Sequence, residues 1–277
     1  MLSFRTDIAL MRATSILQRA VRESPDQVRK LSTGNRLSSV AEDAAGSGVA
    51  SQLKARRFSL RMAMHNSENG ISLISVAESG LQEVSGNLKR MRELAVYSAS
   101  DTLDDDERVY LDDEFVARAD EITRVASMTE WNGVSLLDTD GQIYEVQVGI
   151  DGTANSRINI YLSDLRANGP NMGVDAGSID VLTAANARGA IGAVDQAIDF
   201  VNSLRSGLGA TQNRITGGYR LADRMRLNAA EAESRIRDVD VMFESAQFAK
   251  STMTQDSAMA LVMQARQMSR TALQLLS

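Results

Sequence analysis

The chain has 277 residues, a net charge of −6 and no cysteine, which excludes disulfides, thiolate metal sites and thiol catalysis. Aromatic residues make up only 4% and there are two prolines, whereas residues that favour helices are abundant. The negative net charge does not favour electrostatic binding of nucleic acid or anionic lipid. No run approaches the roughly 18 apolar residues that a membrane span needs. We therefore expect a mainly α protein with no nucleic-acid partner and no membrane insertion.

The first predicted element is a terminal helix whose apolar side chains recur in steps of three and four. These side chains are Leu10, Ala13, Leu17, Ala20, Val28 and Leu31. Pro25 lies within the stripe, and because proline removes a backbone donor, a kink or a helix restart is predicted near Ser24. A turn is predicted at Thr33-Gly34-Asn35.

A second, much longer helix follows. Ser39 and Glu42 fit a capping box, which predicts that the helix begins there. An apolar stripe then runs from Val49 to Ala95 with no proline. A helix of about 50 residues would be about 75 Å long, which predicts a rod.

The middle of the chain combines a shorter helix with strands. The acidic residues 104–107 suit a helix N-terminus, and the helix is predicted to end near the Asn132-Gly133 turn. Alternating apolar residues in 144–148 and 158–162 predict a β-hairpin. The region 167–178, with Pro170 and several glycines, is predicted to be a loop.

A second rod is predicted from Ala184, with an apolar stripe that continues to the end of the chain at residues 275–277. Neither terminal helix can bury its apolar face alone, so both must pack on each other and on neighbouring subunits. The residues predicted for this terminal coiled-coil packing are Leu10, Leu17, Val28, Ile236, Val239, Phe243, Met253 and Met263.

Segments along nearly the whole chain carry a family pattern. Near the start these are Leu31-Ser-Thr-Gly-Asn-Arg-Leu37 and Glu42-Asp-Ala-Ala-Gly46, followed by Leu88-Lys-Arg-Met-Arg-Glu-Leu-Ala-Val96. Near the end they are Leu208-Gly-Ala-Thr-Gln-Asn-Arg214 and Glu233-Ser-Arg-Ile-Arg-Asp-Val-Asp240. In this order they resemble the bacterial flagellins, although the first thirty residues match the usual family start poorly.

The resemblance implies a fold: a long antiparallel helical rod and coiled coil with a small β-hairpin region. Residues 1–40 and 236–277 would form the two parts of an inner coiled-coil domain. Residues 41–180 and 181–235 would form the rod domain. The interval 165–183, where longer flagellins carry variable outer domains, is only a short loop, so a short form without outer domains is expected.

The resemblance also implies a structural, non-enzymatic subunit that polymerises into the flagellar filament for swimming. Its expected location is extracellular, after export without a cleaved signal peptide. Implied partners are copies of itself, the flagellar export apparatus, an export chaperone, and the hook-associated and cap proteins. The alternatives are a hook–filament junction protein, a minor filament subunit, or, from another class, a signalling coiled-coil protein.

Three residues match family positions with a known contact role. Arg90, Leu94 and Glu114 fall where flagellins contact a Toll-like innate receptor and where adjacent subunits pack. Arg90 and Leu94 are four residues apart and are expected on one helix face. The alternative is that all three serve axial contacts between subunits alone.

Catalytic, metal and cofactor sites are not expected. His65 is the single histidine, and one imidazole cannot make a metal site. The segment Asp138-Thr-Asp140-Gly141 lacks the remaining ligands of an EF-hand loop. Neither a phosphate-binding loop nor a nucleophile elbow is present.

Overall fold

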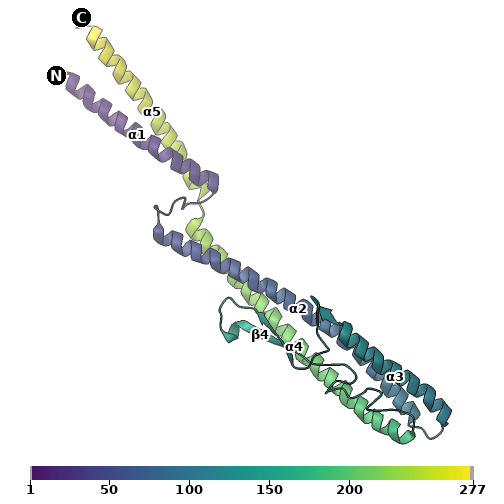
Figure 1. Ribbon diagram of the computed structural model, residues 1–277. Coiled ribbons are helices and arrows are strands. Elements are labelled where there is room, and N and C mark those ends of the chain that lie inside the picture. Colours follow the sequence, from purple (N-terminus) through teal and green to yellow (C-terminus); the bar gives the residue numbers. More distant parts are fainter. Residues whose placement is uncertain (1, 275–277) are drawn as a thin grey trace. The chain divides into compact units, whose positions relative to one another are not determined.

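A computed structural model describes residues 2–274, and it confirms a mainly α fold with a small β region and no outer domain (Figure 1). The helices are α1 (Leu2–Thr33), α2 (Ala44–Ser98), α3 (Asp105–Met128), α4 (Ala184–Arg237) and α5 (Val241–Gln274). The short elements are β1 (Glu130–Trp131), β2 (Val134–Ser135), β3 (Gln142–Gln147), the 3-10 turn Ala154–Ser156 and β4 (Arg157–Leu162).

The chain divides into two compact units. The terminal unit contains the residues up to Arg57 and those from Leu227 onward, and the central unit is Phe58–Arg226. The terminal unit therefore holds α1 and α5, and the central unit holds α3 and the strands.

Helix α1 runs through Pro25 without a break, so of the kink or helix restart predicted near Ser24 the restart is wrong. Proline leaves the carbonyl of Val21 without its usual amide donor. Val21 is 52% exposed and Pro25 is also exposed, so water can hydrate that carbonyl. The turn after α1 is confirmed, with Gly34 at φ +69°.

Helix α2 begins at Ala44, four residues later than a helix capped at Ser39 would begin. Its cap is Asp43, whose carboxylate accepts a hydrogen bond from the Gly46 amide at 2.8 Å. The Glu42 carboxylate instead accepts from the Ser38 amide at 3.1 Å and closes a local turn. The length of 55 residues confirms the predicted long helix.

The acidic start of α3 is confirmed as a capping box between Asp104 and Glu107. The Asn132-Gly133 turn is also confirmed, and it joins β1 to β2 as a tight hairpin. Asn132 has φ 52° and Gly133 has φ 77°, the left-handed conformations that this two-residue turn requires.

The predicted longer hairpin is confirmed by the antiparallel pair β3–β4, in which Val146 lies opposite Ile158. Two glycines allow this hairpin to approach helices α2 and α4 closely. A Cβ on Gly70 of α2 would lie 2.9 Å from a Val146 methyl carbon, and one on Gly218 of α4 would lie 3.3 Å from Val148 Cβ. The missing side chains therefore let the hairpin lie close to both helices.

Helix α4 spans 54 residues, which confirms the second rod from Ala184. The apolar stripe predicted to continue toward the chain end is carried by two helices, because α4 ends at Arg237 and α5 starts at Val241. The Asp240 carboxylate caps α5 by accepting from the Phe243 amide at 3.1 Å. Residues 275–277, to which the predicted stripe extends, lie outside the described residues.

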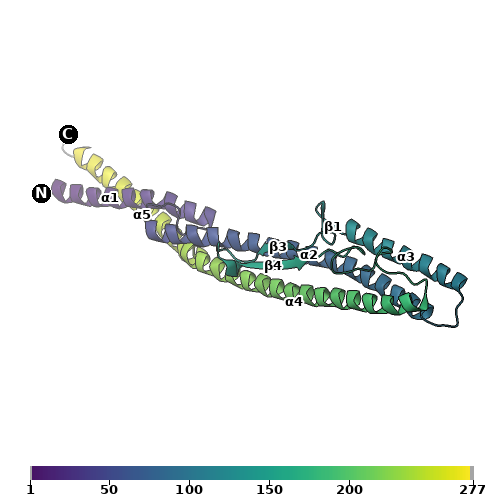
Figure 2. The same cartoon turned by 60° about the horizontal axis from the view of Figure 1, so that its bottom comes forward.

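The core of the central unit lies between α2, α3, α4 and the β3–β4 hairpin (Figure 2). Its fully buried side chains include Leu81, Leu88 and Met91 of α2, Phe115 and Ile122 of α3, Val194 and Val201 of α4, and Ile160 of β4. Apart from Phe115 they are aliphatic, in keeping with the low aromatic content.

Candidate subunit-packing surfaces

The two terminal helices pack along each other through small side chains (Figure 1). Ala13 and Ala20 of α1 and Ser251 and Ala258 of α5 are all at least nine-tenths buried. The Gln255 side-chain amide donates to the Ala20 carbonyl at 2.9 Å. Small residues let the two backbones approach closely, and they leave the larger apolar side chains free to point elsewhere.

Four of the predicted packing residues are half-buried. Leu10 and Leu17 flank the buried alanines of α1, in the expected three-four spacing. Ile236 and Val239 lie at the junction between α4 and α5.

The other four are exposed in the single chain. Val28 is 48% exposed, Phe243 61%, Met253 71% and Met263 63%. They do not fill the α1–α5 contact, where Ala13, Ala20, Ser251, Ala258 and Val262 are buried instead. Packing of these four side chains between copies stays a prediction.

A short pairing of the two interhelical linkers was not predicted. The Arg36 amide donates to the Arg237 carbonyl at 2.6 Å, and the Val239 amide donates to the Gly34 carbonyl at 3.0 Å. These hydrogen bonds join residues 238–240 to a segment two hundred positions away in the chain. They account for the helix break at 238–240. No local sequence pattern predicts a hydrogen-bond partner that lies so far away in the chain.

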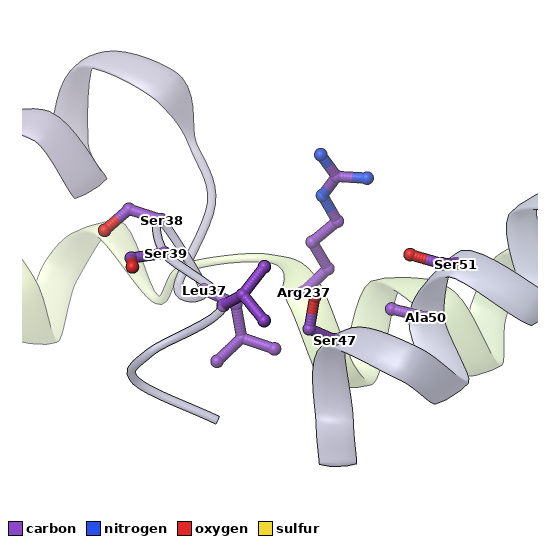
Figure 3. Close-up of a pocket in the computed structure, with 8 residues that line it drawn as sticks. Leu37, Ser38, Ser39, Ser47, Ala50, Ser51 and Arg237 are labelled. Atoms are coloured by element: carbon purple, nitrogen blue, oxygen red, sulfur yellow. The ribbon is translucent and has the colours of Figure 1, made fainter. Parts of the chain in front are cut away.

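An open cavity of about 210 Å³ lies beside the paired linkers (Figure 3). It is lined by Leu37, Ser38, Ser39, Val40, Ser47, Ala50, Ser51 and Arg237. The guanidinium of Arg237 lies 3.8 Å from the Glu233 carboxylate. The lining offers hydroxyls and one cation, and the Ser38 hydroxyl donates to the Glu42 carboxylate at 3.0 Å.

The predicted pair Arg90 and Glu114 meets across α2 and α3. Arg90 donates to both carboxylate oxygens of Glu114, at 2.8 and 3.0 Å, and to Glu93 at 3.1 Å. The hydrogen bonds from Arg90 lower the pKa of Glu114, and Arg118 lowers it further. The same bonds raise the pKa of the Arg90 guanidinium.

Leu94 does not share the surface of this pair. It is only 2% exposed and belongs to the hydrophobic core of the central unit. Contact of Arg90, Leu94 and Glu114 with a partner stays a prediction, and in the single chain the Leu94 side chain is covered by the core whereas that of Arg90 is not.

The Arg90–Glu114 pair predicts a pH-dependent contribution to stability. Because the folded pKa of Glu114 is lowered, the contribution is fully present above its ordinary value near 4.5 and is lost as pH falls through the folded value. Glu114→Gln should therefore lower the melting temperature at pH 7, and the difference from the wild type should shrink as the pH falls below 4.5. Circular dichroism melts over this pH range measure this, and a constant difference at every pH would contradict it.

Long-range ion pairs that no spacing rule predicts join α2 to α4. Arg92 lies 2.6 Å from Asp195, and Arg205 lies 2.6 Å from Glu78. Residue types alone give no signal for such pairs, because the partners are more than a hundred positions apart.

Arg108 was also missed. It is 5% exposed and donates to the backbone carbonyls of Ser98, Ser100 and Leu103, where α2 ends. Its guanidinium thus supplies donors to carbonyls that a helix C-terminus leaves without partners.

Among residues 2–274, no group of three or more His, Asp or Glu side chains is arranged to hold a metal ion. Within the same described range, none of the helices is both long and apolar enough to cross a bilayer.

Comparisons with known proteins cover most of the chain. The bacterial flagellin N-terminal helical region matches residues 4–141, and the C-terminal helical region matches residues 191–276. A flagellin of Halalkalibacterium halodurans is 36% identical over 249 residues, covering 90% of each chain. The flagellar filament 33 kDa core protein of Treponema phagedenis is 34% identical over 261 residues, covering 90% of this chain and 91% of that one.

Among solved structures, the chain is similar to Bacillus cereus flagellin, with 28% identity and a TM-score of 0.49, over 57% of this chain and 88% of that one. The two flagellin regions together match well over half of the chain, in the order and positions of the helices that build both units. The chain therefore belongs to the bacterial flagellin family and is a structural subunit of the flagellar filament.

Proposed function

We propose that this subunit polymerises through the exposed apolar faces of its two terminal helices. The observation that carries the proposal is the row of large apolar side chains left uncovered on α5. Met242 is 86% exposed, Met253 71% and Met263 63%, with Phe243 also exposed. Soluble monomers rarely leave so much apolar surface open, and such patches mark contacts between proteins.

The energetics favour contacts between copies. Burying one such side chain stabilises a contact by about 1.5–3 kcal/mol. Methionine is unbranched and adapts to irregular neighbours, which suits helices that pack in many equivalent positions. Before assembly the same face of α5 is a candidate site for an export chaperone.

We further infer an extracellular location in the filament and a role that involves no catalysis. The export apparatus and the hook-associated and cap proteins are proposed partners. At the surface of the central unit, Arg90 and Glu114 are proposed to contact a neighbouring copy. A Toll-like receptor contact is proposed for these two residues alone, since Leu94 is buried.

Seeded polymerisation tests the proposed function. Purified chain mixed with fragments of its own filaments should form sedimenting filaments that electron microscopy shows to be continuous with the seeds. Chain that stays monomeric in the presence of seeds, with its helices folded by circular dichroism, would contradict assembly into a filament of its own. It would favour a junction protein or a minor subunit that needs another flagellin.

A further inference from the structure

An exposed stripe on α3 carries acidic and apolar side chains at regular helical spacing. Its members are Asp106, Tyr110, Asp113, Ala117 and Asp120, in steps of four, three, four and three, and all are exposed. Tyr110 is 74% exposed, although it is the largest side chain of the stripe. We name this surface the acidic stripe.

A second exposed stripe lies on α4, within the same central unit. Its members are Arg214, Gly217, Leu221 and Arg224, in steps of three, four and three, with the exposed Arg220 beside them. Leu221 is 60% exposed. A Cβ added to Gly217 would meet no atom within 4 Å, so the glycine is not needed for packing inside the chain. We name this surface the basic stripe.

The charged side chains of both stripes have no ion-pair partner among the described residues. Among the residues that the structure describes, none of the charged members of either stripe forms a salt bridge or a side-chain hydrogen bond. Elsewhere on the central unit, exposed arginines such as Arg90, Arg92 and Arg124 each bind a carboxylate. The two stripes therefore hold charges of opposite sign that the fold leaves without partners.

We propose that the acidic stripe of one copy packs on the basic stripe of another copy. The inference rests on the function of the chain as a filament subunit. Both stripes have the alternating three-four spacing with which one helix packs against another. Ala117 and Gly217 let the backbones approach, Tyr110 and Leu221 bury apolar surface, and the opposite charges set the orientation.

The geometry of such a contact suits a filament. The two stripes are different surfaces of one chain, on α3 and on α4 (Figure 2). A copy that is bound through one stripe therefore still presents its other stripe. Contacts between unlike surfaces produce open filaments wherever the rotation between copies does not close into a ring.

Two charge-reversal variants test this pairing. Asp113→Lys with Asp120→Lys makes both stripes of the chain positive, and Arg214→Glu with Arg224→Glu makes both negative. All four positions are exposed and lie inside helices, so both variants should keep the wild-type helicity and melting behaviour. Each variant alone should yield at least about tenfold less sedimenting polymer than the wild type, because like charges then face each other.

A mixture of the two variants provides the decisive result. In an equimolar mixture, every contact between unlike chains again joins a positive stripe to a negative one, so polymer should recover to near the wild-type amount. Glu83→Lys with Asp151→Lys, which alters the net charge as much as the first variant but lies outside both stripes, should polymerise like the wild type.

Other outcomes overturn the proposal. Polymerisation of either stripe variant alone at the wild-type level would show that the stripes do not pair. Binding of a partner of another kind to the basic stripe would show the same. A folded mixture that fails to polymerise would also contradict the pairing. Failure of the wild type itself in the same assay would instead contradict self-assembly as a whole, so the two failures are distinguishable.

Discussion

Replacing Met253 and Met263 together by aspartate should abolish filament formation and leave the folded chain as stable as before. Both side chains are more than 60% exposed in the single chain, at 71% and 63%, so the fold loses almost no packing. In a filament contact the change removes the burial of two methionines, about 3–6 kcal/mol. Each unpaired carboxylate buried there adds a further penalty. Since 1.4 kcal/mol is a factor of ten, the concentration needed for assembly should rise about a hundredfold or more.

Sedimentation after seeding measures the polymer, and a circular dichroism melt verifies the fold. Met62→Asp with Met128→Asp is the matched control. These methionines are 57% and 66% exposed, but they belong to the central unit. Normal polymerisation of the α5 variant, or equal loss in the control, would contradict assembly through the terminal helices.

Replacing Arg108 by alanine should lower the free energy of unfolding of the central unit more than substitutions at exposed positions of α3 do. The guanidinium is buried and donates to three backbone carbonyls at the end of α2, including that of the fully buried Ser98. A buried acceptor left without a donor costs about 1–3 kcal/mol, and charged hydrogen bonds are worth about 1.5–3 kcal/mol. We expect a total loss of about 2–4 kcal/mol, because water can hydrate the two less buried carbonyls.

Urea unfolding followed by circular dichroism measures this loss as a lower midpoint. Arg108→Lys keeps the charge, but one ammonium group cannot reproduce the fork of donors, so it should lose an intermediate amount. Val109→Ala is a neighbouring control at a position that is 46% exposed, and it should change the midpoint little. An unchanged midpoint for Arg108→Ala would show that the α2–α3 turn does not depend on the guanidinium.

The positions of the helices and of the hairpin could be predicted from the sequence, because both depend on the local spacing of apolar residues. The uninterrupted stripe from Val49 to Ala95 lies within α2, and the alternating residues of 144–148 and 158–162 mark the paired strands β3 and β4. The acidic cap of α3 and the Asn132-Gly133 turn were predictable for the same reason, since caps and tight turns use chemistry from a few adjacent residues. The family pattern added the identity of the filament subunit, which periodicity alone leaves open.

The tertiary structure decided which face of each helix is covered and where the helices break. Spacing showed that Arg90 and Leu94 share one side of α2, yet only the packing of α3 and α4 makes position 94 buried while position 90 binds Glu114. The end of α4 at Arg237 depends on backbone hydrogen bonds with the linker near Gly34, and no pattern in either segment shows the other. The terminal stripes were visible in the sequence, but the structure shows that small side chains and Val262 are buried in the α1–α5 contact, whereas Phe243, Met253 and Met263 stay exposed. A sequence period states which side chains share a face, whereas burial depends on which distant segment covers that face.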